Sequence, residues 1–276
     1  MPPLFLDTSI QVDRIVAQDW PDKRVPIKNL LDKFDYLATC SYSRLEFKRV
    51  VIQNLALTLH YLIEEKSFFR AMQRATRLQR SRRTSTLINI MAWVGHRVDG
   101  RAEVSVGSGV DETLTLQAES YIRNGIRSIW KKFDRSVDSV LDKTECKRAT
   151  EAPRVMPSGE VDASIPESQC RSKECNNANF LRSKLPTIRK MCDELEKIKH
   201  RGGTLTDELE EALKTLRSAE GNFDRLYDYQ RCLAVGDVWI HLESLAAGIK
   251  SFATTNYKES QVLCPIFGLE MKPPTE

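Results

Sequence analysis

The sequence lacks the features that mark membrane and secreted proteins. None of the apolar runs in its 276 residues approaches the ~18 residues that a membrane-spanning helix needs. The amino terminus has no basic segment followed by an apolar stretch, so no signal peptide is expected. The seven cysteines form neither a dense framework nor a Cys-x-x-Cys pair, which is typical of reduced thiols. These absences predict a cytoplasmic protein without membrane contact.

The cysteines give little support for a zinc site. Cys146, Cys170, Cys175 and Cys192 lie in or near an irregular segment that a zinc ion could hold together. However, His200 is the only histidine nearby, and no two cysteines have the Cys-x-x-Cys spacing. We therefore expect these side chains to be ordinary thiols.

The pattern of apolar residues differs between the ends and the middle of the chain. Apolar residues make up 41% of the sequence, enough for a buried core. Short apolar runs predict strands at 4–9, 36–40, 251–254 and 267–271, whereas the middle repeats apolar residues at helical spacing. Prolines and an Asn-rich run predict a long irregular loop at 144–180. The α/β pattern is thus confined to the two ends.

Basic residues are concentrated in one helical stretch, although the net charge is only +4. No acid occurs between Glu65 and Asp99. Four arginines in this stretch share one helix face: Arg70, Arg74, Arg77 and Arg80. Unpaired like charges destabilise a helix, so the stripe favours a face that binds the phosphates of a nucleic acid. The alternatives are a solvated face, or a face masked by the acidic segment 193–228.

Three acids stand in contexts that suggest a shared site. Asp7 ends the apolar run Leu4–Leu6, Glu46 follows the predicted strand at 36–40, and Asp237 opens a predicted helix. Each acid also has a purely structural interpretation, because Asp7 and Asp237 could cap helices and Glu46 could be an exposed helix residue. Acids at the carboxyl ends of parallel strands, however, converge on one crevice. Carboxylates held together there favour a hard divalent cation and metal-assisted phosphodiester hydrolysis.

The two ends of the chain resemble a PIN domain, a nuclease fold with a parallel sheet between helices. The motifs that carry the resemblance are Leu6-Asp7-Thr8-Ser9, the Ser-x-x-x-x-Glu of Ser41 to Glu46, Asp237 followed by Gly248, the strand end Thr254-Thr255-Asn256, and Gly268-Leu269-Glu270. The sequence departs from the family at Asn256, where many members carry a fourth acid. It also departs in the length of its helical middle.

The resemblance implies a three-layer α/β/α core with a parallel sheet at 1–65 and 232–276, and a large all-helical insertion at 66–231. It implies a metal-dependent endoribonuclease in which Mg²⁺ or Mn²⁺ activates a water. Asp7, Glu46 and Asp237 would be both the catalytic residues and the metal ligands. The side chains expected to orient these acids or contact phosphate are Ser9, Thr254, Thr255 and Asn256. His241 lies one helical turn after Asp237, but packing is the better reading for it.

Two other functions fit the same residues. A PIN-like scaffold weakened by Asn256 could bind nucleic acid or protein without cutting it. A toxin-type or defence nuclease would be controlled by an inhibitory partner protein that covers the crevice. RNA is the expected partner on the family resemblance alone, and the sequence leaves open whether the chain forms a homo-oligomer.

Overall fold

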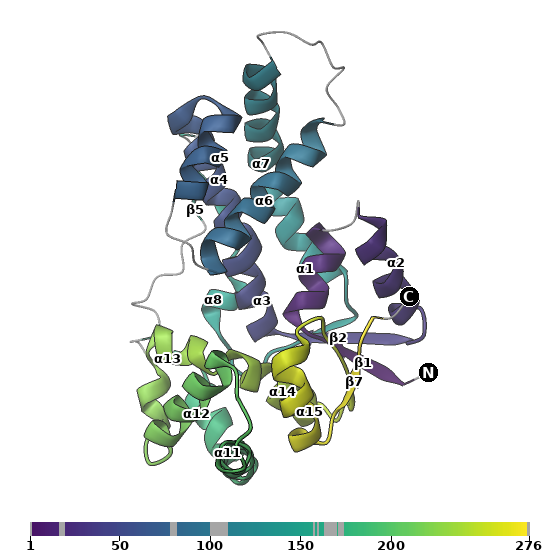
Figure 1. Ribbon diagram of the computed structural model, residues 1–276, viewed down its shortest axis with the longest axis vertical. Helices are drawn as coiled ribbons and strands as arrows, with labels where there is room; N and C mark the ends of the chain where they lie inside the picture. Colours follow the sequence, from purple (N-terminus) through teal and green to yellow (C-terminus); the bar gives the residue numbers. More distant parts are fainter. Residues whose placement is uncertain are drawn as a thin grey trace.

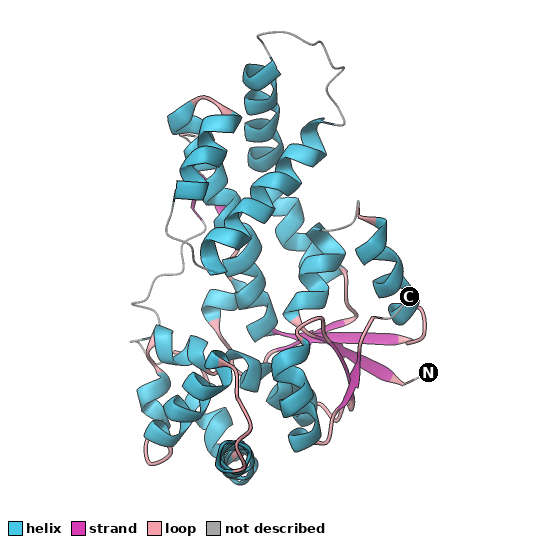
Figure 2. Cartoon of the chain, in the orientation of Figure 1, coloured by secondary structure: helices cyan, strands magenta, loops and turns pink. Residues whose placement is uncertain are grey.

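A computed structural model describes residues 2–16, 20–77, 82–99, 110–156, 158, 160–162, 170 and 174–274. It is a mixed α/β structure in which one small parallel sheet is surrounded by many helices (Figures 1 and 2). Among the described residues, no helix combines the length and the apolar character needed to cross a membrane.

The sheet has five strands, all parallel, in the order β3-β2-β1-β6-β7. The strands are β1 (Pro3–Leu6), β2 (Tyr36–Cys40), β3 (Ser139–Leu141), β6 (Ser251–Ala253) and β7 (Glu270–Lys272). The central strand β1 pairs with β2 through Leu4 and Leu37, and with β6 through Phe5 and Phe252. The predicted α/β class with a parallel sheet is therefore confirmed.

Helices cover both faces of the sheet, and the side chains of β1 alternate between the two faces. Leu4 and Leu6 point to one face, where they join Ile10 of α1 (Thr8–Val16) and apolar residues of α2 (Pro21–Leu31). Phe5 points to the other face, where it stacks on Phe252 with ring centroids 5.6 Å apart. Apolar residues of α14 (Gly236–Ala246) and α15 (Tyr257–Phe267) cover that second face. Helices thus lie on both sides of the strands, as Figure 1 shows.

The helical middle is divided by a strand, so the single all-helical insertion predicted at 66–231 is wrong in this respect. The long helix before this strand ends at Arg135, and Val140 lies in β3. Residues Ala38, Thr39 and Cys40 of β2 pair with β3, which makes β3 an edge strand of the main sheet. Two helical parts, one on each side of β3 in the sequence, take the place of one insertion.

The first helical part extends away from the sheet, at the top of Figure 1. It consists of α4 (Gln53–Glu65), α5 (Phe68–Arg77), α6 (Arg82–Asp99) and α7 (Val110–Arg135). A hydrophobic cluster of its own joins these helices and includes Trp93, Trp130 and Phe133. Helix α3 (Ser41–Phe47) runs through a π-helical turn (Lys48–Ile52) into α4 with right-handed backbone angles at both junctions. This one helical rod connects the sheet to the first helical part.

The second helical part packs directly on the sheet. Its elements are α8 (Lys147–Thr150), α10 (Asn177–Ser183), α11 (Leu185–His200), α12 (Asp207–Ala219), a 3₁₀ turn (Phe223–Leu226) and α13 (Tyr229–Ala234). Their apolar side chains share one hydrophobic cluster with Phe5 and Phe252. The predicted loop at 144–180 also holds a short antiparallel pair, β4 (Arg154–Val155) and β5 (Val161–Asp162), and several of its residues lie outside the described part.

Helix α14 carries a carboxyl group in the core. Glu243 is 0% exposed, and the backbone N–H of Lys143 faces its carboxyl group. Burial raises the pKa of Glu243 to about 7; the Asp142 carboxylate adds to the shift, and the backbone and charge of Lys143 oppose it. The folded chain therefore keeps a proton on Glu243 at pH values where the unfolded chain releases it.

This proton makes stability depend on pH. Between the ordinary pKa of 4.5 and about 7, the contribution of Glu243 to the free energy of unfolding should fall as pH rises, with a slope of up to roughly 1.4 kcal/mol per pH unit. Glu243→Gln should remove this slope, because a neutral amide has no proton to lose. Urea unfolding at several pH values measures it, with Glu211→Gln at a side chain 57% exposed as the control. An equal slope in wild type and Glu243→Gln would contradict the prediction.

Candidate functional site

The order of the strands reverses between β1 and β6, and we call the edge of the sheet at the carboxyl ends of these two strands the crevice. From β1 the chain builds the sheet outward through β2 and β3, then returns to the other side of β1 to add β6 and β7. Ligands of open parallel sheets bind at such a reversal, outside the carboxyl ends of the strands. Asp7 follows β1 there, and Thr254 follows β6.

The Asp7 carboxylate is held by donors from both sides of this crevice. Its Oδ1 accepts the backbone N–H of Thr8 at 2.6 Å. Its Oδ2 accepts the hydroxyls of Ser9 and Thr254, both at 2.7 Å. The side chain is 6% exposed, so these three donors replace much of the water that a free carboxylate would bind.

The same hydroxyls accept bonds from the loop that follows β6. The backbone N–H of Thr255 donates to Ser9 Oγ at 2.9 Å, and that of Asn256 donates to Thr254 Oγ1 at 2.8 Å. The structure thus brings Asp7, Ser9 and the segment Thr254–Asn256 together. Asn256 enters this network through its backbone, just before α15 begins at Tyr257.

Glu46 is connected to Asp7 through a residue that sequence reasoning missed. Thr8, the first residue of α1, donates its hydroxyl to Glu46 Oε2 in α3 at 2.6 Å. Thr8 was part of the quoted motif but was given no role, because a threonine between two functional residues has no signal of its own. Thr8 bridges two of the three acids, because its N–H donates to Asp7 and its hydroxyl donates to Glu46.

Asp237 lies near Glu46 because the residue before it, Gly236, packs against Glu46 and Tyr42. A Cβ atom added to Gly236 would lie 3.0 Å from Glu46 Oε1 and 2.9 Å from Tyr42 Cε1. Only glycine lets α14 begin this close to α3. Asp237 is the next residue, and its charge, like that of Glu46, raises the pKa of the buried Tyr42 hydroxyl, although burial is the largest cause. Contacts therefore run from Asp7 through Thr8 and Glu46 to the start of α14.

The helices also favour negative charge at this edge of the sheet. Helices α1, α3 and α15 begin shortly after the strands that precede them, and α14 begins beside Glu46. Helix N-termini carry a partial positive charge and unpaired N–H groups. Their convergence offsets part of the repulsion among the three acids.

The acids are not arranged around a metal position. Among the described residues, no group of three or more His, Cys, Asp and Glu side chains is placed to hold a metal ion. The oxygens of Asp7 and Glu46 point instead at the hydroxyl and N–H donors of the neighbouring chain. The donor types suit Mg²⁺ or Mn²⁺, because all are hard oxygens, but a bound ion would require some of these side chains to turn.

His241 lies below the crevice rather than in it. It is 2% exposed, and its ring stacks on Phe252 with centroids 4.3 Å apart. Its Nδ1 donates to the backbone carbonyl of Asp237 at 2.7 Å when the proton is on that nitrogen. Burial lowers the pKa of His241 to about 4, so the ring is neutral at pH 7. The packing interpretation agrees with this position.

The arginine stripe is only partly available to a partner. Arg70 and Arg77 are exposed on α5, whereas Arg80 lies outside the described residues. Arg74 pairs with Glu64 and Glu65 and lies over the Tyr61 ring. The expectation that no acid partners the stripe is thus wrong for Arg74.

The acidic segment 193–228 does not lie over α5. Several of its acids pair with cations of the second helical part: Asp193, Glu196 and Glu220 with Arg217, Glu220 with Arg189, Asp224 with Arg182, and Glu210 with Lys199. In Figure 1, α11 and α12 lie at the opposite end of the molecule from α5. The masking alternative therefore does not describe this fold.

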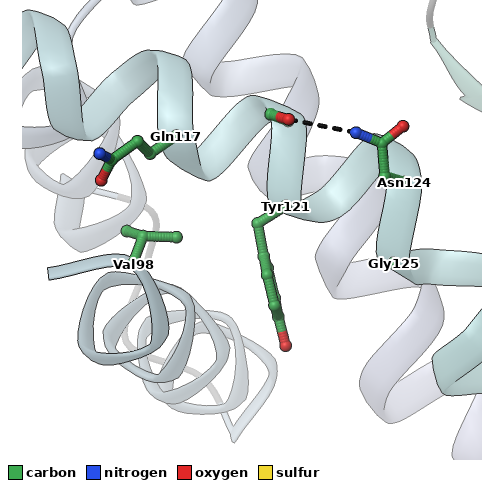
Figure 3. A pocket seen from close by; sticks show the side chains of 6 residues that line it. Val98, Gln117, Tyr121, Asn124 and Gly125 are labelled. Carbon is green, nitrogen blue, oxygen red and sulfur yellow. Dashed lines mark hydrogen bonds between the residues drawn. The ribbon is translucent and has the colours of Figure 1, made fainter. Parts of the chain in front are cut away.

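A pocket of about 420 Å³ lies between α6 and α7, apart from the acids (Figure 3). Its lining consists of Val98, Gln117, Ser120, Tyr121, Asn124 and Gly125. No carboxylate, histidine or cation lines it, so it lacks the groups needed for hydrolysis.

Comparisons with known proteins add no family. No protein-family model, no curated protein and no solved structure matches the chain.

The tight start of α14 can be tested by one methyl group. Gly236→Ala should destabilise the protein by about 1–3 kcal/mol, because the methyl would press on Tyr42 and Glu46. Gly125→Ala in α7 is the control, since its methyl would meet only Ile129 Cδ1 at 3.8 Å and should stabilise the helix by up to ~1 kcal/mol. Chemical denaturation measures both changes. Equal effects of the two substitutions would show that α14 does not begin against α3.

Proposed function

We propose that this protein is a PIN-type, metal-dependent endoribonuclease. The observation that supports it most is the linked arrangement at the crevice between β1 and β6. Asp7 is bound to Thr254 across the crevice, Thr8 bridges to Glu46, and Gly236 places the start of α14 against Glu46. Three acids that lie far apart in the sequence thus border one edge of the sheet, where parallel sheets bind their ligands.

In this proposal, each residue of the site has a separate role in metal binding or in the orientation of the acids. Asp7, Glu46 and Asp237 would hold Mg²⁺ or Mn²⁺, and the bound ion would lower the pKa of a water and offset charge on the phosphate. Ser9 and Thr254 keep the Asp7 carboxylate in one orientation by donating to the same oxygen. Asn256 adds an amide where many relatives have an acid, so the site would bind cations less tightly than a four-acid site.

RNA as the substrate rests on the family resemblance. The charge on α5 is consistent with a polyanion, since Arg70 and Arg77 are exposed there. The rod formed by α3, the π-helical turn and α4 connects this surface to Glu46. An RNA strand held at α5 would therefore lie near the far end of the helical rod that carries Glu46.

A PIN-like binding module without nuclease activity is the second candidate. Two observations favour it: the described acids do not already surround a metal position, and Asn256 supplies no fourth charge. Such a module would retain RNA binding at α5 and lose only the cleavage step. Metal-dependent cleavage separates the two functions.

Replacement of Asp7 tests the nuclease proposal. Asp7→Asn should reduce RNA cleavage by more than about 100-fold while the fold is kept, because asparagine is equally favoured before a helix start. EDTA should abolish cleavage by the wild type, and Mn²⁺ should restore it. Asp13→Asn on the same helix is the control, since Asp13 pairs with Lys23 at 3.0 Å instead. Cleavage that survives both Asp7→Asn and EDTA would exclude this site.

The surface on α5 is tested by the salt dependence of binding. Replacing Arg70 and Arg77 by Gln should weaken RNA binding at all sequences alike. It should flatten the slope of log affinity against log salt by about one to two units, because fewer counterions are released. Lys190 and Lys214 on α11 and α12, both exposed, give a control pair at the other end of the molecule. If the slope of log affinity against log salt is unchanged in the arginine variant, the stripe is a solvated face that does not bind RNA.

A further inference from the structure

Phe69 in α5 is the most exposed aromatic side chain of the described residues. It is 56% exposed, whereas no other Phe, Tyr or Trp of this part of the chain exceeds 41%. A single exposed apolar residue is common on protein surfaces, so its surroundings decide whether it has a role. Here the surroundings are an anchored backbone, a supporting ring and two exposed cations.

The start of α5 is fixed to α7. The Asp111 carboxylate accepts the backbone N–H groups of Phe68 at 2.9 Å and of Phe69 at 3.2 Å. Its other oxygen accepts the Ser67 hydroxyl at 2.5 Å. The hydroxyl of Thr115, about one turn further along α7, also accepts the N–H of Phe68 at 2.8 Å. The backbone that carries Phe69 is thus held by a neighbouring helix.

The Phe69 ring is supported by a buried neighbour. Phe68 is 6% exposed, and a Cβ atom added to Gly95 of α6 would lie 3.0 Å from its Cζ. The rings of Phe68 and Phe69 meet edge to face, with centroids 6.4 Å apart and planes at 89°. Phe68 therefore anchors α5 to α6 and supports the exposed ring. A side chain that is already held loses little conformational freedom when a ligand packs on it.

The exposed face of α5 places cations beside this ring. Phe69, Gln73 and Arg77 are all exposed and follow one another at intervals of four residues, which puts them in one row. Arg70 is exposed next to that row. The row spans about 12 Å along the helix axis, so its two ends can contact different nucleotides of one strand. An aromatic ring and two guanidinium groups therefore share one surface, and α5 contains no acid.

This combination suits RNA better than an apolar partner. Proteins that bind single strands combine a positively charged surface, which follows the phosphates, with aromatic side chains on which bases stack. Leu116 of α7 is 62% exposed and follows Thr115, so a second exposed apolar side chain lies at the same end of the molecule. A partner recognised by apolar contact alone would not need the arginines. The charge of α5 is complementary to phosphate, and the flat ring of Phe69 is complementary to a base.

We propose that Phe69 stacks on an unpaired base of RNA bound at α5, so that this surface selects single strands over duplexes. The inference rests on the proposed function, which puts RNA on the same helix. Phosphates are present in both forms of RNA, so Arg70 and Arg77 contribute affinity without distinguishing them. The bases of a duplex are stacked inside it and present no free face to a side chain. Phe69 is therefore the residue that supplies the preference.

Binding of the full-length protein to three RNAs tests this role. The RNAs are an unstructured single strand, its duplex, and an abasic strand of the same length, measured by fluorescence anisotropy in EDTA so that they stay intact. Phe69→Leu should weaken binding to the single strand by about 10-fold, because it keeps an apolar side chain but loses the ring. Affinity for the duplex should change by less than about 2-fold, and the salt slope should stay the same, since no charge is lost.

Two further comparisons separate stacking from a general loss of structure. Phe69→Tyr should bind all three RNAs as the wild type does, because it restores a ring. The wild type should bind the abasic strand about 10-fold more weakly than the intact strand, whereas Phe69→Leu should bind the two strands almost equally. Leu116→Ala is the matched control, since it removes an exposed apolar side chain at the same end of the molecule and should leave binding unchanged.

The double variant Arg70→Gln, Arg77→Gln separates this inference from the proposed function. It should weaken single-strand and duplex binding alike. If it does so while Phe69→Leu binds the single strand as the wild type does, the stacking role is wrong and the RNA-binding surface stands. If neither variant weakens binding, or the wild type binds no RNA, the surface on α5 is wrong and the stacking role with it. Equal losses in Phe69→Leu and Leu116→Ala would indicate apolar contact and overturn base stacking.

Discussion

The hydrogen bond from Thr254 to Asp7 is the interaction on which the site depends. It joins the ends of β1 and β6 at the point where the strand order reverses, and it fixes the orientation of the first acid. Thr8 extends this connection to Glu46, and Gly236 extends it to α14. Each link uses a small residue or a hydroxyl, because a larger side chain would keep the helix starts apart. The crevice is therefore built by residues next to the acids as much as by the acids themselves.

Sequence reasoning succeeded where local pattern and tertiary structure agree. The strand at 36–40 was predicted with its observed bounds, because Tyr36–Cys40 is a short apolar run whose last three residues are buried. The edge strand β3 was not, since its three residues are half-buried and follow a long amphipathic helix without a break signal. Helix α2 was not predicted either, although Pro21 occupies its first turn, where proline is tolerated.

The candidate site could be predicted by residue but not by geometry. The motifs located Asp7, Ser9, Glu46, Asp237 and Thr254 at one edge of the sheet, since each motif carries its own strand end or helix start. Spacing alone could not show that Thr8 bridges two acids. That bridge depends on how distant segments pack. Likewise, Glu64 and Glu65 reach Arg74 only because α5 folds back against α4.

A crystal structure of the protein grown with Mn²⁺ would test the central claim most directly, because manganese can be located by its anomalous scattering. The account predicts a manganese peak between β1 and β6, within about 2.0–2.6 Å of carboxylate oxygens from Asp7, Glu46 and Asp237. The Thr8–Glu46 bond should then be broken or lengthened. An empty crevice at saturating Mn²⁺, with that bond intact, would contradict it and leave the protein as a binding module.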